Sequence, residues 1–378
     1  MSKPNIRPNL AQSKRWIVKI GSALLTKDGQ GLDVESLQTW VKQITDIRTA
    51  GTEVVLVSSG AVAEGMSRMG WITRPSTLHG LQAAAAIGQM GLIQAYETAF
   101  RQYELQTAQI LLTHDDLSNR RRYLNARSTL STLLDHGVIP IVNENDTVAY
   151  DEIQLGDNDT LGALVANLLG ADILVILTDQ QGLFDKDPRY HSEAQLISEG
   201  HSNDPELLKF AGSAGTNIGT GGMRTKILAA ERAARSGCST IIAAGREDNI
   251  LNRLYQGETL GTLLMANEKP LLARKQWLAG HLKSRGKLWL DAGAIEALTV
   301  FGKSLLSVGV VKTQGHFSRG DMVSCLNLDG QIIAQGLINY NHNETNKISG
   351  YSSQNIATLL GYVDESELIH RDNLVVLS

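Results

Sequence analysis

Two lysines in this sequence stand where a phosphate group could bind. The first, Lys19, is the penultimate residue of the apolar stretch Trp16–Ile20, and Gly21 and Ser22 follow that stretch directly. A lysine inside an apolar strand is costly unless its ammonium group emerges at a polar site. Glycine after the strand allows the backbone to approach a ligand closely. The pattern indicates a phosphate contact, although a lysine that reaches solvent at a sheet edge would also fit it.

The second lysine, Lys226, closes a glycine-rich entry to a predicted helix. Its spacing is not that of a P-loop, but free N–H groups and the helix dipole attract anions to such a helix start. Arg224 and Lys226 are disfavoured there by the dipole, and a bound anion would relieve that conflict. A solvated helix start with a glycine turn is the alternative interpretation. The nucleotide-binding candidates are Gly219, Thr220, Gly221, Gly222, Met223, Arg224, Thr225 and Lys226.

Carboxylates and amides gather in two further stretches, 143–146 and 156–160. A carboxylate between two lysines would hold their ammonium groups in place and keep them protonated. Asp157, Asn158 and Asp159 could equally cap a helix, and spacing alone does not decide between these roles. The acids could also form a metal cage, but Mg²⁺ usually takes few protein ligands and uses the phosphates of its nucleotide.

The elements that must position these residues follow an α/β pattern. Short apolar runs alternate with helical patterns such as 33–50, where Asp33 is a candidate N-cap. Continuous apolar strands predict a parallel sheet buried on both faces, hence a doubly wound three-layer αβα sandwich. Ligands bind beyond the carboxyl ends of such strands, where small, polar and acidic residues follow several of the runs. The predicted strands are 16–20, 54–57, 109–112, 138–142, 173–177 and 240–243.

Composition narrows the class of protein. The net charge of −4 and pI of about 6.2 give no support to electrostatic binding of nucleic acid. Cys238 and Cys325 form no C-x-x-C pattern, which argues against a disulfide framework or a zinc site. The polar start, 1–14, does not resemble a signal peptide, and no apolar run is long enough to span a membrane. A cytoplasmic protein without a membrane partner is therefore expected.

The pattern changes near residue 270, where strands become short and punctuated by glycine. The predicted divisions are a catalytic domain at 14–268, a linker at 269–284, a small β-barrel at 285–363 and a C-terminal extension at 364–378. Residues 283–378 carry eight Lys and Arg against nine Asp and Glu, which makes this module a poor electrostatic site for RNA.

The ordered set of motifs resembles the amino-acid kinase family, specifically its members that phosphorylate glutamate and carry a C-terminal PUA domain. The matching elements are 18–22, 57–61, 143–146, 156–159 and 219–226, with 317–320 in the PUA region. The order of the set separates these members from kinases of the same fold that act on aspartate, acetylglutamate, carbamate or uridylate.

The resemblance implies a role for each matching position. Lys19 and Lys226 would contact the transferred phosphoryl group, and Asp159 would orient them. Arginine at position 224 departs from the small residue expected there. The remaining implied contacts are Ser59, Gly60, Asp146, Asp157 and Asn158 for glutamate, and Thr178, Asp179 and 219–226 with Lys19 for ATP.

The resemblance further implies ATP and Mg²⁺ as cofactors, a homo-oligomer and feedback inhibition by proline. A glutamate carboxylate, with a reference pKa of about 4.3, is already an ionised nucleophile at neutral pH, so no general base is needed. Two readings compete with this one: a kinase of the same fold acting on another carboxylate or phosphate, and an RNA-binding protein acting through the PUA-like barrel.

Overall fold

The computed structural model describes residues 7–26, 31–148, 158–212, 222–266 and 284–377. The chain divides into two compact units, one of 1–117 with 126–270 and one of 118–125 with 271–378. Within the described ranges, no helix is both long and apolar enough to cross a membrane. Cys238 and Cys325 are both buried, and neither forms a disulfide.

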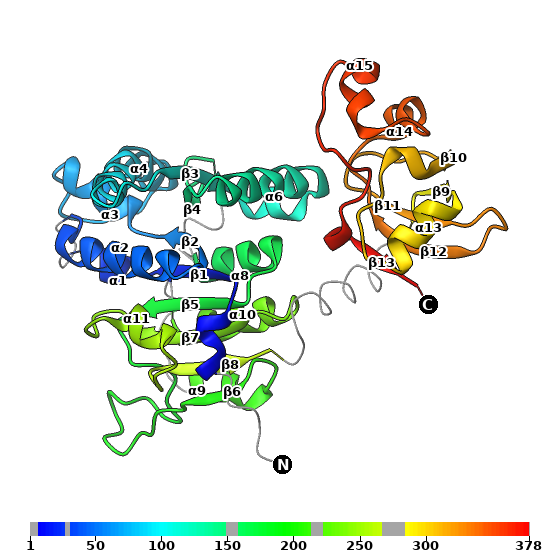
Figure 1. Ribbon diagram of the computed structural model, residues 1–378. Coiled ribbons are helices and arrows are strands. Elements are labelled where there is room, and N and C mark those ends of the chain that lie inside the picture. The colour runs from blue at the N-terminus through cyan, green and yellow to red at the C-terminus, as the bar shows by residue number, and fades with distance from the viewer. Residues whose placement is uncertain (1–6, 27–30, 149–157, 213–221, 267–283, 378) are drawn as a thin grey trace, which may run out of the picture. The chain divides into compact units, whose positions relative to one another are not determined.

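The larger unit is built on an eight-stranded sheet in the order β3-β4-β2-β1-β5-β7-β8-β6, which runs from top to bottom in Figure 1. The central strand β1 pairs in parallel with β2 on one side and β5 on the other. The chain therefore turns to opposite sides of β1, which in an α/β sheet creates a crevice at the carboxyl ends of the strands. The strands are β1 (Arg15–Ile20), β2 (Glu53–Ser58), β3 (Thr107–Leu112), β4 (Ile139–Glu144), β5 (Ile173–Thr178), β6 (Glu199–His201), β7 (Ser239–Ala244) and β8 (Thr262–Met265).

Helices cover both faces of this sheet. Along β1, Trp16 and Val18 point into a hydrophobic cluster with α2, α4 and α11, whereas Lys19 points to the opposite face, where it meets α8. Alternate strand residues face opposite sides, so one strand serves both layers. The helices are η1 (Arg7–Gln12), α1 (Ser22–Leu25), α2 (Val34–Thr49), α3 (Ala61–Arg68), α4 (Leu78–Arg101), α5 (His114–Ser118), α6 (Arg120–Asp135), α8 (Asn158–Leu169), α9 (Pro205–Gly212), α10 (Met223–Ala234) and α11 (Ile250–Tyr255).

Local sequence signals set the helix ends. The Asp33 side chain accepts a hydrogen bond from the backbone N–H of Ser36, which confirms the predicted N-cap of α2. Gly51 follows that helix at a φ of +100°, a left-handed conformation that glycine adopts without a Cβ penalty. Thr77 caps α4 in the same way as Asp33, through the N–H of Gly80.

The sheet differs from the prediction in two respects. It is mixed, because β8 runs antiparallel to β7 and pairs in parallel with β6. These last two strands have only four and three residues, too short to stand out as apolar runs. Strand β3 is an edge strand with several partly exposed residues, so it is not buried on both faces as expected.

The smaller unit contains a five-stranded sheet in the order β10-β9-β11-β12-β13 around its own apolar core. This confirms a small β-rich domain, although three short α-helices in it were not predicted. Strand β13 lies in the predicted C-terminal extension and pairs with β12. The elements are β9 (Gly286–Leu290), α13 (Ala292–Thr299), η2 (Ser307–Gly309), β10 (Val310–Gly315), β11 (Met322–Leu326), β12 (Ile332–Leu337), α14 (His342–Ile348), η3 (Ser353–Asn355), α15 (Ile356–Leu360), η4 (Arg371–Asn373) and β13 (Leu374–Val376).

Candidate active site

A cavity of about 520 Å³ lies at the carboxyl ends of the central strands. Its volume is in the usual range for a small-molecule site. It gathers residues predicted from six separate parts of the sequence, as expected where the ends of parallel strands meet at one edge. The predicted site residues that line it are Lys19, Ser59, Gly60, Asp146, Asn158, Thr178, Asp179, Gly222 and Lys226.

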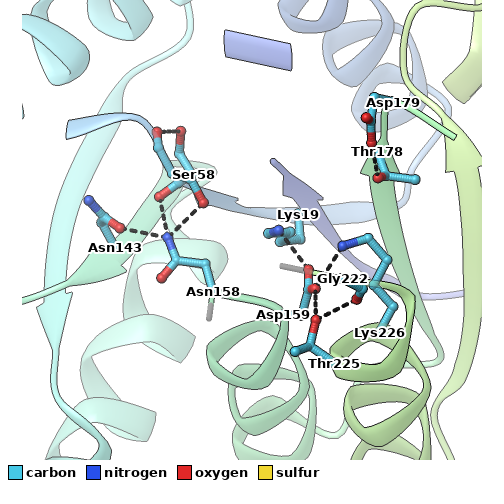
Figure 2. Close-up of polar contacts among 11 residues, drawn as sticks. Lys19, Ser58, Asn143, Asn158, Asp159, Thr178, Asp179, Gly222, Thr225 and Lys226 are labelled. Carbon is cyan, nitrogen blue, oxygen red and sulfur yellow. Dashed lines mark hydrogen bonds and ion pairs between the residues drawn. The ribbon is translucent and has the colours of Figure 1, made fainter. Parts of the chain in front are cut away.

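The two predicted lysines are joined by one carboxylate (Figure 2). The Nζ atom of Lys19 on β1 lies 2.6 Å from Oδ1 of Asp159, at the start of α8. Nζ of Lys226, on α10, lies 2.9 Å from Oδ2 of the same carboxylate. Each oxygen thus pairs with one ammonium group, which fixes the spacing between the two positive charges.

The three side chains of this cluster are buried, and the lysines favour the ionised form of Asp159. The side chains of both lysines are 5 % exposed, and that of Asp159 is 0 % exposed. Burial by itself would raise the pKa of Asp159, but the ammonium groups of Lys19 and Lys226 outweigh it and hold that pKa below its usual value. The carboxylate is therefore anionic at neutral pH. It balances one of the two ammonium groups, so the cluster of three side chains keeps a net positive charge.

Two helix starts support the same cluster. Asp159 lies in the first turn of α8, where the helix dipole favours a negative charge. Thr225, in the first turn of α10, shares its single hydroxyl hydrogen between Asp159 Oδ2 at 3.0 Å and the carbonyl oxygen of Gly222 at 2.7 Å. The threonine hydroxyl thereby ties the start of α10 to the carboxylate that holds both lysines.

Beside this cluster, Asn158 anchors an amide-lined wall. Its two Nδ2 hydrogens are shared among three acceptors, the carbonyl oxygen of Ser58 at 2.9 Å, Ser59 Oγ at 3.0 Å and Asn143 Oδ1 at 2.8 Å. In Figure 2, Ser58, Asn143 and Asn158 lie on one side of Lys19, and Thr178 and Asp179 lie on the other. The lysine therefore stands between two polar regions of the cavity.

The outer parts of the cavity carry further charged groups. Burial raises the pKa of Asp146 to about 6, against the opposing effect of the Arg74 guanidinium. On the opposite side, Thr178 Oγ1 donates to Asp179 Oδ1 at 2.9 Å. The carboxyl group of Asp146 consequently titrates close to physiological pH.

Some predicted residues lie elsewhere. Asp157, Gly219, Thr220 and Gly221 fall outside the described residues. Met223 packs against the apolar cluster beneath α9 and α10. Arg224 is exposed and does not line the cavity.

Gln89 escaped the sequence-based prediction, and Asn143 fell within the predicted polar stretch 143–146 but was given no role. Asn143 lines the cavity and donates from Nδ2 to Oε1 of Gln89 on α4 at 2.7 Å. The available signal was Gln89 itself, a polar residue on the otherwise apolar buried stripe of α4 between Ala85 and Leu92.

Within the described ranges, no group of three His, Cys, Asp or Glu side chains is placed to hold a metal ion. Mg²⁺ in nucleotide sites usually keeps water and binds through phosphates and one or two carboxylates. Asp179 and Glu144 line the cavity and are carboxylates of that kind.

Comparison with known proteins decides the family. A sequence profile described as the amino acid kinase family matches residues 14–244, and one described as the PUA domain matches 286–360. The chain belongs to the amino acid kinase family. The matched family region contains both lysines and the carboxylate between them.

Curated relatives in this family match nearly the whole chain. A protein of Thioalkalivibrio sulfidiphilus named glutamate 5-kinase is 62 % identical over 371 residues, which cover 98 % of this chain and 99 % of the relative. A glutamate 5-kinase of Nitrosospira multiformis is 61 % identical over 368 residues, covering 97 % and 99 %. One solved structure, UMP kinase from Bacillus anthracis, covers 68 % of this chain and 97 % of its own at 16 % identity and a TM-score of 0.47.

Proposed function

We propose that this protein is a glutamate 5-kinase, which transfers the γ-phosphoryl group of ATP to the side-chain carboxylate of L-glutamate in the first step of proline biosynthesis. The observation that carries the proposal is the buried carboxylate of Asp159, which holds Lys19 and Lys226 beside a cavity of suitable size. The full-length similarity to proteins named glutamate 5-kinase supports the same substrate.

The chemical obstacle is electrostatic. A carboxylate oxygen of glutamate attacks the γ-phosphorus, the bond from that phosphorus to the bridging oxygen of ADP breaks, and ADP leaves with the electron pair. The nucleophile is already ionised at neutral pH, since its reference pKa is about 4.3. No proton must be removed, so catalysis consists of bringing two anions together and stabilising the charge on the transferred group.

The lysine pair supplies that stabilisation. An ammonium group has three N–H donors, so a lysine that pairs with Asp159 can also donate to a phosphate oxygen. Because Asp159 uses a different oxygen for each lysine, the two cations are held in position before substrate binds. Preorganised charge of this kind costs no reorganisation during the reaction.

The two polar regions of the cavity suit the two substrates. Ser59, Asp146 and Asn158 would hold glutamate, and an ionised Asp146 offers a counter-charge to its α-ammonium group. Thr178, Asp179 and the start of α10 would hold the nucleotide, where the N-terminus of that helix favours phosphate. Mg²⁺ would enter with the nucleotide, and none of these steps depends on its placement.

The direct test is a substrate panel. The purified protein is incubated with MgATP and hydroxylamine, which traps an acyl phosphate as a stable hydroxamate. We expect hydroxamate and ADP in equal amounts with glutamate, and little product with aspartate or acetylglutamate. If the protein turned over acetylglutamate, aspartate or UMP in preference to glutamate, that compound would be the substrate and the proposal would be wrong.

The lysine role is tested by Lys226→Ala, with Lys42→Ala on the exposed face of α2 as a matched control. Loss of one charge-stabilising donor lowers kcat by roughly 100-fold. The control leaves kcat close to that of the parent protein. If Lys226→Ala changed only KM and left kcat unaltered, Lys226 would have no role in stabilising the transition state.

Three further proposals come from the resemblance alone: a cytoplasmic location, a homo-oligomeric state and inhibition by proline. Light scattering of the purified protein measures the second. The hydroxamate assay with added proline measures the third.

A further inference from the structure

A chain of side-chain amides leads from helix α4 to the amide-lined wall of the cavity. Gln89 Oε1 accepts from Asn143 Nδ2 at 2.7 Å, and Asn143 Oδ1 accepts from Asn158 Nδ2 at 2.8 Å. Asn158 Nδ2 also donates to the carbonyl oxygen of Ser58 at 2.9 Å. Gln89 is 9 % exposed, Asn158 6 % and Asn143 2 %, so water does not compete freely for these contacts.

The direction of this amide chain is set at one end. The backbone oxygen of Ser58 can only accept, so Asn158 must point its NH₂ group toward it. Asn143 must then present its oxygen to Asn158 and its nitrogen to Gln89. Gln89 in turn must present its oxygen. One backbone carbonyl at the end of β2 therefore fixes the orientation of three amides.

Helix α4 holds its end of the amide chain in place by close packing. A Cβ on Gly88 would lie 1.8 Å from the carbonyl oxygen of Ala61, so at this point the backbones of α3 and α4 are in direct contact. About two turns further along α4, the hydroxyl groups of Tyr96 and Ser58 are 3.0 Å apart. Gln89 thus sits on a helix that is anchored on both sides of it.

We propose that Gln89 is a positioning residue for the amino-acid substrate. It fixes the Asn143 amide, which fixes Asn158 so that its nitrogen is committed to the protein. The carbonyl oxygen is then the polar atom that Asn158 offers to the cavity, and an acceptor suits the α-ammonium group of glutamate. This inference rests on the proposed function and adds a residue behind the cavity wall to it.

The contacts of Gln89 make the proposal specific. Its Oε1 is used, whereas among the described residues no acceptor pairs with its buried Nε2. Glutamate at this position keeps an acceptor oxygen at the same reach, and methionine keeps the length but has no comparable acceptor. Gln89→Glu should therefore preserve much of the function that Gln89→Met loses.

The test compares the two variants in the hydroxamate assay, with thermal unfolding measured for each. Removing one partner of a buried hydrogen bond leads us to expect that Gln89→Met lowers kcat/KM for glutamate about tenfold. KM for ATP should change less than about twofold, because the amide chain ends on the glutamate side. Gln89→Glu should recover most of the loss.

A double-substitution cycle with Asn143→Leu separates positioning from packing. If Gln89 acts through Asn143, then Gln89→Met should cause little further loss once Asn143 has been replaced. The positioning role would be overturned if Gln89→Met impaired the kinetic constants for glutamate and ATP equally. It would also be overturned if the losses in kcat/KM from the two substitutions were independent, provided that the parent protein phosphorylates glutamate. A parent protein inactive on glutamate would overturn the proposed function, and this inference with it.

Discussion

Replacing the carboxylate that joins the two lysines tests the electrostatic account most directly. In Asp159→Asn, the amide retains the shape of the side chain but removes the only charge that both ammonium groups share in the described cluster. Both lysine side chains are 5 % exposed, so solvent does little to replace the lost anion.

The size of the effect follows from the geometry. Two ammonium groups that contact opposite oxygens of one carboxylate are roughly 5 Å apart, and at an effective dielectric constant of about 20 they repel by about 3 kcal/mol. Removing one partner of a buried ion pair typically costs about 3–5 kcal/mol. We expect the free energy of unfolding to fall by about that amount, with a drop in Tm on the order of 10 °C.

Nucleotide should reverse part of this loss. A bound triphosphate brings negative charge to the lysines, so a non-hydrolysable ATP analogue should raise the Tm of Asp159→Asn more than that of the parent protein. Because the lysines are no longer held in position, we also expect kcat to fall by about 100-fold or more.

The assay is thermal unfolding of both proteins with and without the analogue, alongside steady-state kinetics. Glu206→Gln is a matched control, because it removes a carboxylate paired with Lys209 on an exposed helix surface. Exposed pairs contribute at most about 1 kcal/mol. Parent-like stability and kcat in Asp159→Asn would refute the reasoning.

Two other predictions concern the acidic end of the cavity and the contact between α3 and α4. Because burial raises the pKa of Asp146 to about 6 against the effect of Arg74, its carboxyl group is neutral below that pH, and kcat/KM for glutamate should fall up to about tenfold per pH unit there. A pH profile of Asp146→Asn should lack this limb; if it keeps the limb, another group is responsible. In Gly88→Ala the new Cβ would lie 1.8 Å from the carbonyl oxygen of Ala61, so unfolding experiments should show a loss of at least about 1–3 kcal/mol. Gly293→Ala in α13 meets only an ordinary contact at 3.6 Å, so it should leave stability unchanged or raise it by up to about 1 kcal/mol. Equal losses in the two variants would discount the backbone contact.

That the residues of the central cluster lie close together was predictable, because the topology of a parallel sheet brings their elements to the same edge. Lys19, Asp159 and Lys226 are far apart in sequence, but each lies at the end of a strand or the start of a helix that opens at the carboxyl edge. Parallel strands bring such ends together whatever the loops between them do. Spacing alone did not separate capping from function for Asp159, and the family resemblance was needed to place it between the two lysines.

The amide chain was not predictable, for a different reason. Gln89 reaches Asn143 only because α4 packs against α3 at a backbone-to-backbone distance that glycine permits. No motif encodes that distance. Arg224 is a different case: a cation in a glycine-rich helix start suggested a phosphate contact, its side chain is exposed and is not among the residues that line the cavity, and the contact stays a prediction.

The anchored helix α4 has a practical meaning for anyone who wishes to redesign the enzyme. Gly88, Gln89 and Tyr96 respectively set its spacing from α3, its link to Asn143 and its link to Ser58. If only cavity-lining positions were varied, these contacts of α4 would keep the backbone at the ends of β2 and β4 in its present position. New substrate preferences should be sought by varying these helix positions together with the strand ends that they touch.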